Sequence, residues 1–194
     1  MRVIVSGGGT GGHIFPAISI ANALKEADPN VDILFVGAKG KMEMEKVPAA
    51  GYKIIGLPVA GFHRKLSLYN ICRNMLFPFK LVASMLKARS VIKEFKPDVV
   101  IGVGGYVTVP VLKAASKLKY KTFLHEQNSV PGKANLFLAN DVDMIGVSFK
   151  SSASSFPEGK TIFTGNPCSE DAIKKPPMEK SELGLDPNKK LIFA

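Results

Sequence analysis

Short apolar runs alternate with amphipathic segments along this chain of 194 residues. A short apolar run predicts a buried strand, and apolar residues that recur every three or four positions predict a helix. The predicted strands are 3–5, 33–36, 54–57, 99–103, 121–124, 144–146 and 161–163. Helical patterns lie at about 16–26, 42–50 and 68–95 (with a break near Pro78), and again after the strands that end at 103 and 124. Repeated strand–loop–helix units predict an α/β fold, in which a parallel, doubly wound, Rossmann-like sheet carries helices on both faces.

A glycine-rich turn follows the first predicted strand. The segment SGGGTGGHIFPAISIANAL, residues 6–24, places five glycines before its helical pattern. Gly7, Gly9 and Gly12 match the G-x-G-x-x-G spacing, but a dinucleotide site also needs an acidic residue at the end of the second strand. Residues 35–38, FVGA, contain none, and no Gly-Lys-Ser/Thr follows the glycines to make a P-loop. What remains is a helix N-terminus whose free N–H groups bind a diphosphate or another anion.

Two further unusual loops also follow predicted strands. The sequence GGYVTVP begins at Gly104, and HEQNSVPGKAN begins at His125. In open α/β sheets, ligands bind at the carboxyl ends of the strands, and all three loops lie at that edge. The sequence therefore predicts one ligand site that is built from three loops.

Several polar side chains in these loops have both a structural and a chemical interpretation. His13, at the start of the first helical pattern, is either a capping or packing residue or a general base, because imidazoles titrate near neutral pH. His125 and Glu126 lack a further histidine at the spacing of a zinc helix, so we expect no metal site. Asn128 and Asn135 are either ordinary caps or ligand contacts.

Positive charge is concentrated in one part of the chain. Residues 63–121 carry twelve Lys/Arg and two acidic residues, so their net charge equals the +10 of the whole chain. Residues 66–81 interleave leucine and phenylalanine with Arg73 and Lys80. This pattern fits either a core helix with a solvated basic face or a surface that enters an anionic membrane. We expect no nucleic-acid partner, because no reader motif is present.

The last segment of the chain has a different composition. Residues 168–190 are polar, contain prolines and carry mixed charge, which predicts a linker, and 191–194 have the apolar pattern of another buried strand. We therefore expect one domain at 1–166. We expect 167–194 to be a linker with the first strand of a further domain.

Four motifs in this order resemble those of one enzyme family. GGTGGHIFPA (8–17), KPDVVIGVGGYVTVP (96–110), HEQNSVPGKAN (125–135) and FTGNP (163–167) are similar to the motifs of the MurG family of bacterial glycosyltransferases. The resemblance implies the N-terminal half of a two-domain GT-B fold. It also implies a hexosyltransferase that moves N-acetylglucosamine, with inversion, from UDP-N-acetylglucosamine (UDP-GlcNAc) to lipid I (undecaprenyl-diphosphate-MurNAc-pentapeptide). The product is lipid II, for peptidoglycan synthesis, and neither a metal nor another cofactor is implied.

The resemblance also implies the residues of the site. The catalytic residues would be His13 and, as the alternative base, Glu126. The implied substrate-binding residues are Thr10, Gly11, Gly12, Gly104, Gly105, Tyr106, His125, Asn128, Asn135 and Ser169. Family members commonly carry an arginine just after Gly-Asn-Pro that reaches the donor, whereas Cys168 and Ser169 stand here. This part of the family's donor contact is therefore missing from the pattern.

The resemblance further implies a place in the cell and a set of partners. We expect a peripheral protein at the cytoplasmic face of the bacterial cell membrane, on the anionic inner-membrane surface and near other proteins of cell-wall synthesis. The isolated chain should lack transferase activity, because the family's other half supplies most of the donor pocket. The alternative is a non-catalytic, membrane-recruiting half that needs a separate catalytic chain. A nucleotide-dependent oxidoreductase is a more distant interpretation.

Overall fold

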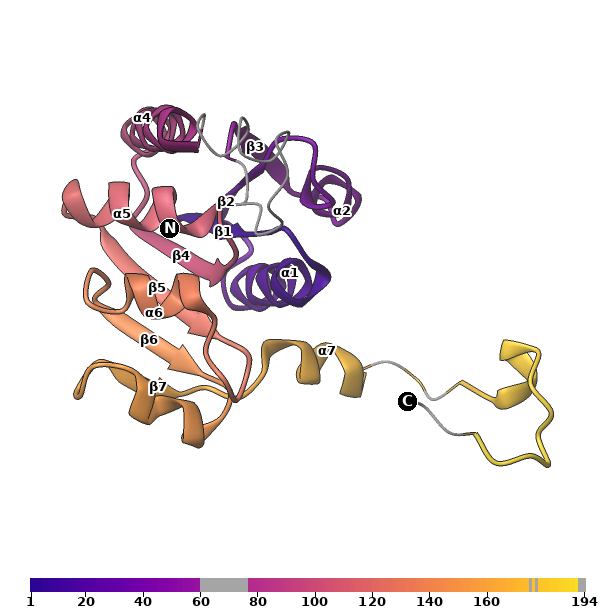
Figure 1. The fold of residues 1–194 in the computed structure, drawn as a ribbon. Coiled ribbons are helices and arrows are strands. Elements are labelled where there is room, and N and C mark those ends of the chain that lie inside the picture. Colours follow the sequence, from indigo (N-terminus) through magenta and orange to yellow (C-terminus); the bar gives the residue numbers. More distant parts are fainter. Residues whose placement is uncertain (60–76, 175, 177, 192–194) are drawn as a thin grey trace, which may run out of the picture.

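A parallel sheet forms the centre of the molecule, in a computed structural model that describes residues 1–59, 77–174, 176 and 178–191 (Figure 1). Its seven strands lie in the order β3-β2-β1-β4-β5-β6-β7, and every neighbouring pair is parallel. This order runs outward in both directions from β1, as in a doubly wound sheet. The predicted fold class and all seven predicted strands are confirmed. The strands are β1 (Arg2–Gly7), β2 (Asp32–Ala38), β3 (Lys53–Leu57), β4 (Val99–Gly104), β5 (Lys121–Glu126), β6 (Met144–Val147) and β7 (Thr161–Phe163).

Helices connect the strands and cover both faces of the sheet. Side chains from α4, α5, α6 and η1 pack on one face and those from α1 and α2 on the other, which gives three layers. The α-helices of the described chain are α1 (Gly11–Ala27), α2 (Glu43–Ala49), α4 (Phe77–Phe95), α5 (Thr108–Lys117), α6 (Lys133–Leu138) and α7 (Pro167–Lys174); η1 (Lys150–Ser155) and η2 (Lys180–Leu183) are 3-10 helices.

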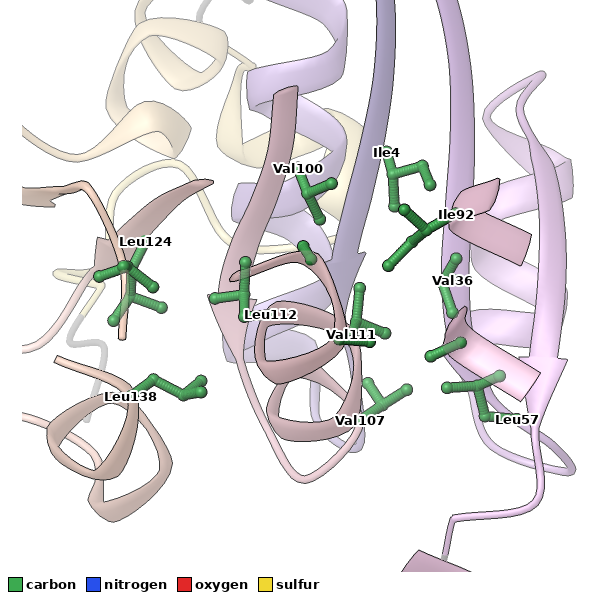
Figure 2. Packing of buried hydrophobic residues seen from close by; sticks show 14 of the residues in the cluster. Ile4, Val36, Leu57, Ile92, Val100, Val107, Val111, Leu112, Leu124 and Leu138 are labelled. Carbon is green, nitrogen blue, oxygen red and sulfur yellow. The ribbon is translucent and has the colours of Figure 1, made fainter. Parts of the chain in front are cut away.

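Alternation along the central strands builds two separate cores. Ile4 of β1 contributes to the core under α4 and α5, whereas its neighbours Val3 and Val5 contribute to the core under α1. Figure 2 shows the first core, where Ile4 and Ile92 lie beside the apolar side chains of α5. Because both faces are covered, the central strands are apolar at nearly every position, as is usual in parallel sheets.

Helix α1 begins earlier than its apolar pattern predicts. It starts at Gly11 rather than near Pro16, because the carbonyl of Thr10 accepts hydrogen bonds from the N–H groups of His13 and Ile14. Pro16 therefore lies inside the helix and not in its first turn. This earlier start brings Gly11, Gly12 and His13 into the first turn.

Helix α4 and the chain before it only partly test the predicted basic segment. Residues 60–76, which include Arg73 and the first part of the predicted 68–95 helix, lie outside the described residues. Pro78 falls in the first turn of α4, where a missing N–H costs no hydrogen bond, so proline is well tolerated there. Lys87 is half-buried and donates a hydrogen bond of 2.8 Å to the carbonyl of Gly56 in β3.

The segment after β7 begins with a helix where a linker is predicted. Helix α7 packs against α1, and the Ser19 hydroxyl lies 3.8 Å from the Cys168 sulfur. Beyond α7, residues 178–191 lie apart from the sheet and are almost entirely exposed (Figure 1). The strand predicted at 191–194 falls almost wholly outside the described residues.

Candidate functional site

Two glycine loops touch at the carboxyl edge of the sheet. The first loop, residues 8–12, leads from β1 into α1, and the second, residues 104–107, leads from β4 into α5. The N–H of Gly8 donates a hydrogen bond of 3.3 Å to the carbonyl of Gly104. Gly105 has φ +87°, and a Cβ there would overlap the carbonyl oxygen of Gly8. Only glycine permits this approach, so the sequence-predicted loops form one continuous backbone surface.

The first loop offers three free amide donors. Within the described chain, the N–H of Gly8 is bonded to Gly104 and that of Gly9 to the Glu43 carboxylate. The N–H groups of Thr10, Gly11 and Gly12 have no partner among the described residues. The side chain of the N-cap residue Thr10 makes no capping hydrogen bond in the described part of the chain, and the first turn of α1 holds no acidic residue. These donors and the positive end of the helix dipole suit an anion.

His13 and Asn135 meet beside the second loop. The His13 ring lies so close to Gly104 that a Cβ there would be 2.8 Å from its Nδ1, and 3.4 Å from Oδ1 of Asn135. Both of these polar atoms are buried and lack a hydrogen-bond partner in the described structure. Buried polar atoms are rarely unpaired. Two such atoms around one point mark a place that a ligand or a water molecule completes.

A small cleft opens on the other side of the loops. It has a volume of about 30 Å³, enough for a water molecule, and is lined by Gly8, Gly9, Ala38, Lys41, Val59, Tyr106 and Val107. Tyr106 is 54% exposed at its rim, and Lys41 is also exposed. Lys41 is thus a cation beside the glycine loops that its sequence context does not reveal.

Glu126 organises the loop after β5. Its side chain is fully buried. Oε1 accepts hydrogen bonds from the backbone and side-chain N–H groups of Asn128, both at 2.9 Å. Oε2 accepts from the Gly132 N–H at 2.9 Å and from Nδ2 of Asn135 at 2.8 Å. With four donors on two oxygens, this carboxylate shapes the loop and orients Asn135, which favours a positioning role over that of a base.

His125 is buried rather than open to a ligand. Its Nε2 lies 3.1 Å from the Thr164 hydroxyl and 3.3 Å from the carbonyl oxygen of Gly165, just beyond β7. Its Nδ1 lies 3.3 Å from Nε2 of Gln127, whose side chain is also buried. Burial lowers the pKa of His125 below its ordinary value of 6.5, although the Gly165 hydrogen bond and the Glu126 charge act in the opposite direction. A neutral ring with its proton on Nε2 fits these contacts, since Nδ1 then accepts from Gln127.

Glu43 is another residue of this edge whose role the sequence did not predict. It is fully buried at the start of α2. Oε2 accepts the Gly9 N–H at 3.1 Å, and Oε1 accepts the Ala38 N–H, at the end of β2, at 2.9 Å. A dinucleotide motif expects an acidic residue at this place. The structure supplies one five residues later in the chain, from a helix whose sequence, EMEKVPA, reads as an exposed charged surface.

One expected site residue lies away from the glycine loops. Ser169 is exposed on α7, and none of the described contacts joins its side chain to the glycine loops. Across the described ranges, no group of three or more His, Cys, Asp or Glu residues could hold a metal ion. In the same ranges, no helix is both long enough and apolar enough to span a bilayer.

Comparison with known proteins places this chain beside a family of glycosyltransferases. Residues 3–147 match the model of the glycosyltransferase family 28 N-terminal domain. Over its full length the chain is 50% identical to the UDP-N-acetylglucosamine–N-acetylmuramyl-(pentapeptide) pyrophosphoryl-undecaprenol N-acetylglucosamine transferase of Bacteroides fragilis, of which it covers 50%. The enzyme of that name from Flavobacterium psychrophilum is also 50% identical, over 99% of this chain and 52% of its own length. The chain thus spans about half the length of the curated relatives it matches.

Solved structures agree with this match. The crystal structure of Acinetobacter baumannii MurG superposes with a TM-score of 0.69 and 28% identity, over 85% of this chain and 45% of that protein. The UDP-GlcNAc 2-epimerase of Neisseria meningitidis, bound to UDP-GlcNAc, superposes with a TM-score of 0.60 at 18% identity, over 90% and 51%. At that identity the epimerase shows a shared fold alone. Together with the curated relatives, the MurG match confirms the resemblance that the four sequence motifs predicted.

Proposed function

The chain belongs to glycosyltransferase family 28, through that family's N-terminal domain, and on this premise we propose that it is the acceptor half of a lipid II-forming transferase. Its residues 1–166 would bind lipid I at the cytoplasmic face of the membrane. The transferred sugar would come from UDP-GlcNAc, since the names of the 50%-identical relatives describe that reaction. The observation that carries the proposal is the pair of touching glycine loops, with free amides on the first loop and two unpaired polar atoms beside the second.

The diphosphate of lipid I would lie on the first glycine loop. The free N–H groups of Thr10, Gly11 and Gly12 would donate to its oxygens, and Lys41 would add a positive charge from the neighbouring cleft. Binding of an anion by backbone amides needs no metal ligand from the protein. The donor set in the described site consists of N–H groups and cations, which suits a phosphate group better than a neutral sugar.

The acceptor hydroxyl would lie at His13. In an inverting transfer, the C4 hydroxyl of the muramyl sugar attacks the anomeric carbon of GlcNAc, its proton passes to a base, and UDP leaves with the bonding electron pair. Nδ1 of His13 is covered beside Gly104, so we assign proton uptake to Nε2 of the half-buried ring. Asn135, held by Glu126, lies on the covered side of this ring, so we assign it to positioning His13 rather than to contact with the acceptor.

Binding to lipid-borne phosphates tests the acceptor assignment. The chain is sedimented with neutral phosphatidylcholine vesicles that contain either lipid I or undecaprenyl monophosphate. We expect at least about tenfold tighter binding to the lipid I vesicles, because the cradle gains a second phosphate and the sugar. Lys41→Gln should weaken this binding, whereas Lys119→Gln, the same charge change at the opposite edge of the sheet, should not. Equal binding to the two lipids contradicts the acceptor assignment.

Turnover tests the role of His13. In a complete transferase that carries this domain, His13→Gln should lower kcat by about 10²- to 10⁴-fold, the usual contribution of a general base. The KM for lipid I should change little. A loss of about tenfold or less assigns His13 a structural role and moves the search for the base to Glu126.

The outer surface of α4 is the proposed membrane contact. Phe79, Val82 and Leu86 recur at helical spacing and are 73%, 56% and 64% exposed. The exposed cations Arg89 and Lys93 follow them on the same helix. Apolar side chains that enter the interface and cations that meet anionic headgroups together give stable peripheral binding. Lys87 is excluded from this surface, because its ammonium is bonded to Gly56.

Binding to anionic vesicles at different salt concentrations tests this surface. Phe79→Ser with Leu86→Ser should reduce sedimentation with phosphatidylglycerol vesicles and leave the salt dependence of the residual binding in place. Neutralising Arg89 and Lys93 should instead reduce the salt dependence, since each cation near an anionic surface contributes about 1 kcal/mol. If both double variants bind as the wild type does while folded, α4 is an ordinary solvated helix and the membrane assignment fails.

A further inference from the structure

Glu43 is bonded to the first glycine loop one residue before its free amides, through the N–H of Gly9. Its two oxygens bond to backbone N–H groups of two different loops, Gly9 after β1 and Ala38 at the end of β2. Gly8 and Gly37 also press on its side chain, since a Cβ at either position would overlap Glu43 atoms. The carboxylate is therefore enclosed by backbone from both loops and is 0% exposed.

This position prevents the carboxylate from serving a nucleoside. In dinucleotide-binding folds, the acidic residue at this corner accepts hydrogen bonds from ribose hydroxyls. Here both oxygens accept from the protein's own backbone, and no surface is left for a ligand. The corner that would hold a ribose is thus occupied by the protein itself.

We propose that Glu43 is a positioning residue that clamps the first glycine loop and so presents the amides of Thr10, Gly11 and Gly12 to a diphosphate. This inference rests on the proposed function, because it assumes that the loop binds the acceptor diphosphate. By fixing the N–H of Gly9, the clamp sets the direction of the next three peptide groups. Without it, the loop would have to order itself when the anion binds, which weakens affinity.

Electrostatics alone makes the opposite prediction for a variant at this residue. A buried carboxylate close to an anion site repels the anion, so removing its charge should tighten binding if charge were its main effect. Within the described residues, no ion pair neutralises Glu43. In Glu43→Gln, the side-chain NH₂ must face one of the two backbone donors, so the clamp is lost along with the charge. The sign of the change therefore separates the two effects.

Titration with inorganic pyrophosphate measures that sign. The ¹⁵N-labelled chain is followed by amide NMR at constant ionic strength. The wild type should bind with the largest shifts at Thr10, Gly11 and Gly12. Glu43→Gln should bind about tenfold more weakly, whereas Glu45→Gln, the same charge change at an exposed position of the same helix, should bind as the wild type does. Unchanged or tighter binding by Glu43→Gln overturns the clamp.

Hydrogen exchange in the wild type provides a test that does not depend on the variant's folding. The Gly9 amide should exchange slowly, and the amides of Thr10, Gly11 and Gly12 should exchange fast until pyrophosphate is added. Fast exchange at Gly9 contradicts the clamp, whatever the titrations give. A wild type that binds no pyrophosphate while Gly9 is protected contradicts the proposed acceptor cradle but leaves the clamp standing as a support of the loop.

Discussion

Two corners of the site edge are held by fully buried glutamates, and the two corners are built differently. At the β2–α2 corner (Ala38, Glu43 and Gly9), the carboxylate accepts two backbone N–H groups. At the β5–α6 corner (Glu126 with the loop to Asn135), the carboxylate accepts two backbone and two side-chain N–H groups. The first joins segments 34 residues apart, whereas the second closes a loop of nine residues.

The difference separates two uses of a buried carboxylate. Glu126 shapes its own loop and passes that order on to Asn135, one of the two side chains with an unpaired polar atom beside Gly104. The Glu43 side chain extends from helix α2 and fixes the backbone of the first glycine loop. It accepts the Gly9 N–H directly, without an intervening side chain. When one member of a side-chain network changes, a neighbouring amide side chain can rotate and offer its oxygen in place of its NH₂ group. A backbone N–H can only donate.

The largest predicted effect breaks the contact between the two glycine loops, which lie between these corners. Gly105→Ala should lower the free energy of unfolding by about 3–5 kcal/mol, because its Cβ would overlap the Gly8 carbonyl oxygen and φ is +87°. Gly9→Ala is the matched control, since it has the same φ but open space around its Cβ. It should cost only about 1–2 kcal/mol. Urea unfolding measures both, and equal losses would show that steric overlap is not what limits residue 105.

The next effect compares the corners through their alanine variants. Glu126→Ala removes the acceptor of four hydrogen bonds and should lower the free energy of unfolding by about 4 kcal/mol, whereas Glu43→Ala removes the acceptor of two and should cost about 2 kcal/mol. Urea midpoints at constant m-value give the two numbers. A larger loss for Glu43 would mean that the long-range clamp stabilises the fold more than the local loop does.

Glutamine variants sharpen the same comparison. In Glu126→Gln, the amide of Asn128 or Asn135 can flip to accept from the new NH₂, so one backbone donor is lost. In Glu43→Gln, one backbone donor is also lost, and no partner can flip. The two glutamine variants should therefore lower the free energy of unfolding by a similar amount, about 1–3 kcal/mol, whereas the two alanine variants should differ. The same urea series decides it, and a twofold difference between the glutamine variants would contradict the account of flipping.

The smallest effect is a pH dependence from His125, the residue next to the β5–α6 corner. Burial lowers the pKa of His125 in the folded state, so the unfolded chain takes up a proton first as the pH falls. The contribution of His125 to the free energy of unfolding should be fully present above the ordinary histidine pKa of 6.5. It should decline as the pH drops below that value, until the ring in the folded state is also protonated. His125→Gln should flatten this decline in Tm between pH 7 and 5. If the difference in Tm between the wild type and His125→Gln stays constant from pH 7 to pH 5, His125 has the same pKa in the folded and unfolded states.

The sequence by itself determined the elements of this protein and most of the site's local chemistry. Apolar runs on a sheet that is covered on both faces identify its strands without knowledge of the partners. The glycine loops and the His125–Asn135 loop are recognisable because the residues that act together are close in sequence, as Glu126 is to Asn128, Gly132 and Asn135. Their position at one edge follows from the parallel topology alone.

Which polar side chains of this edge are buried and bonded to the backbone depends on tertiary contacts. Glu43 lies in a helix where charged residues usually meet water, and its burial depends on Gly9, 34 residues away. His125 stands in a motif that suggests a ligand contact, yet strand pairing between β5, β6 and β7 places Gly165 against its ring. Lys87 belongs to a basic run, but the packing of α4 on the sheet brings its ammonium to the Gly56 carbonyl. In each case the bonding partner lies many residues away in the chain. Neither composition nor local periodicity predicts which distant residues come into contact.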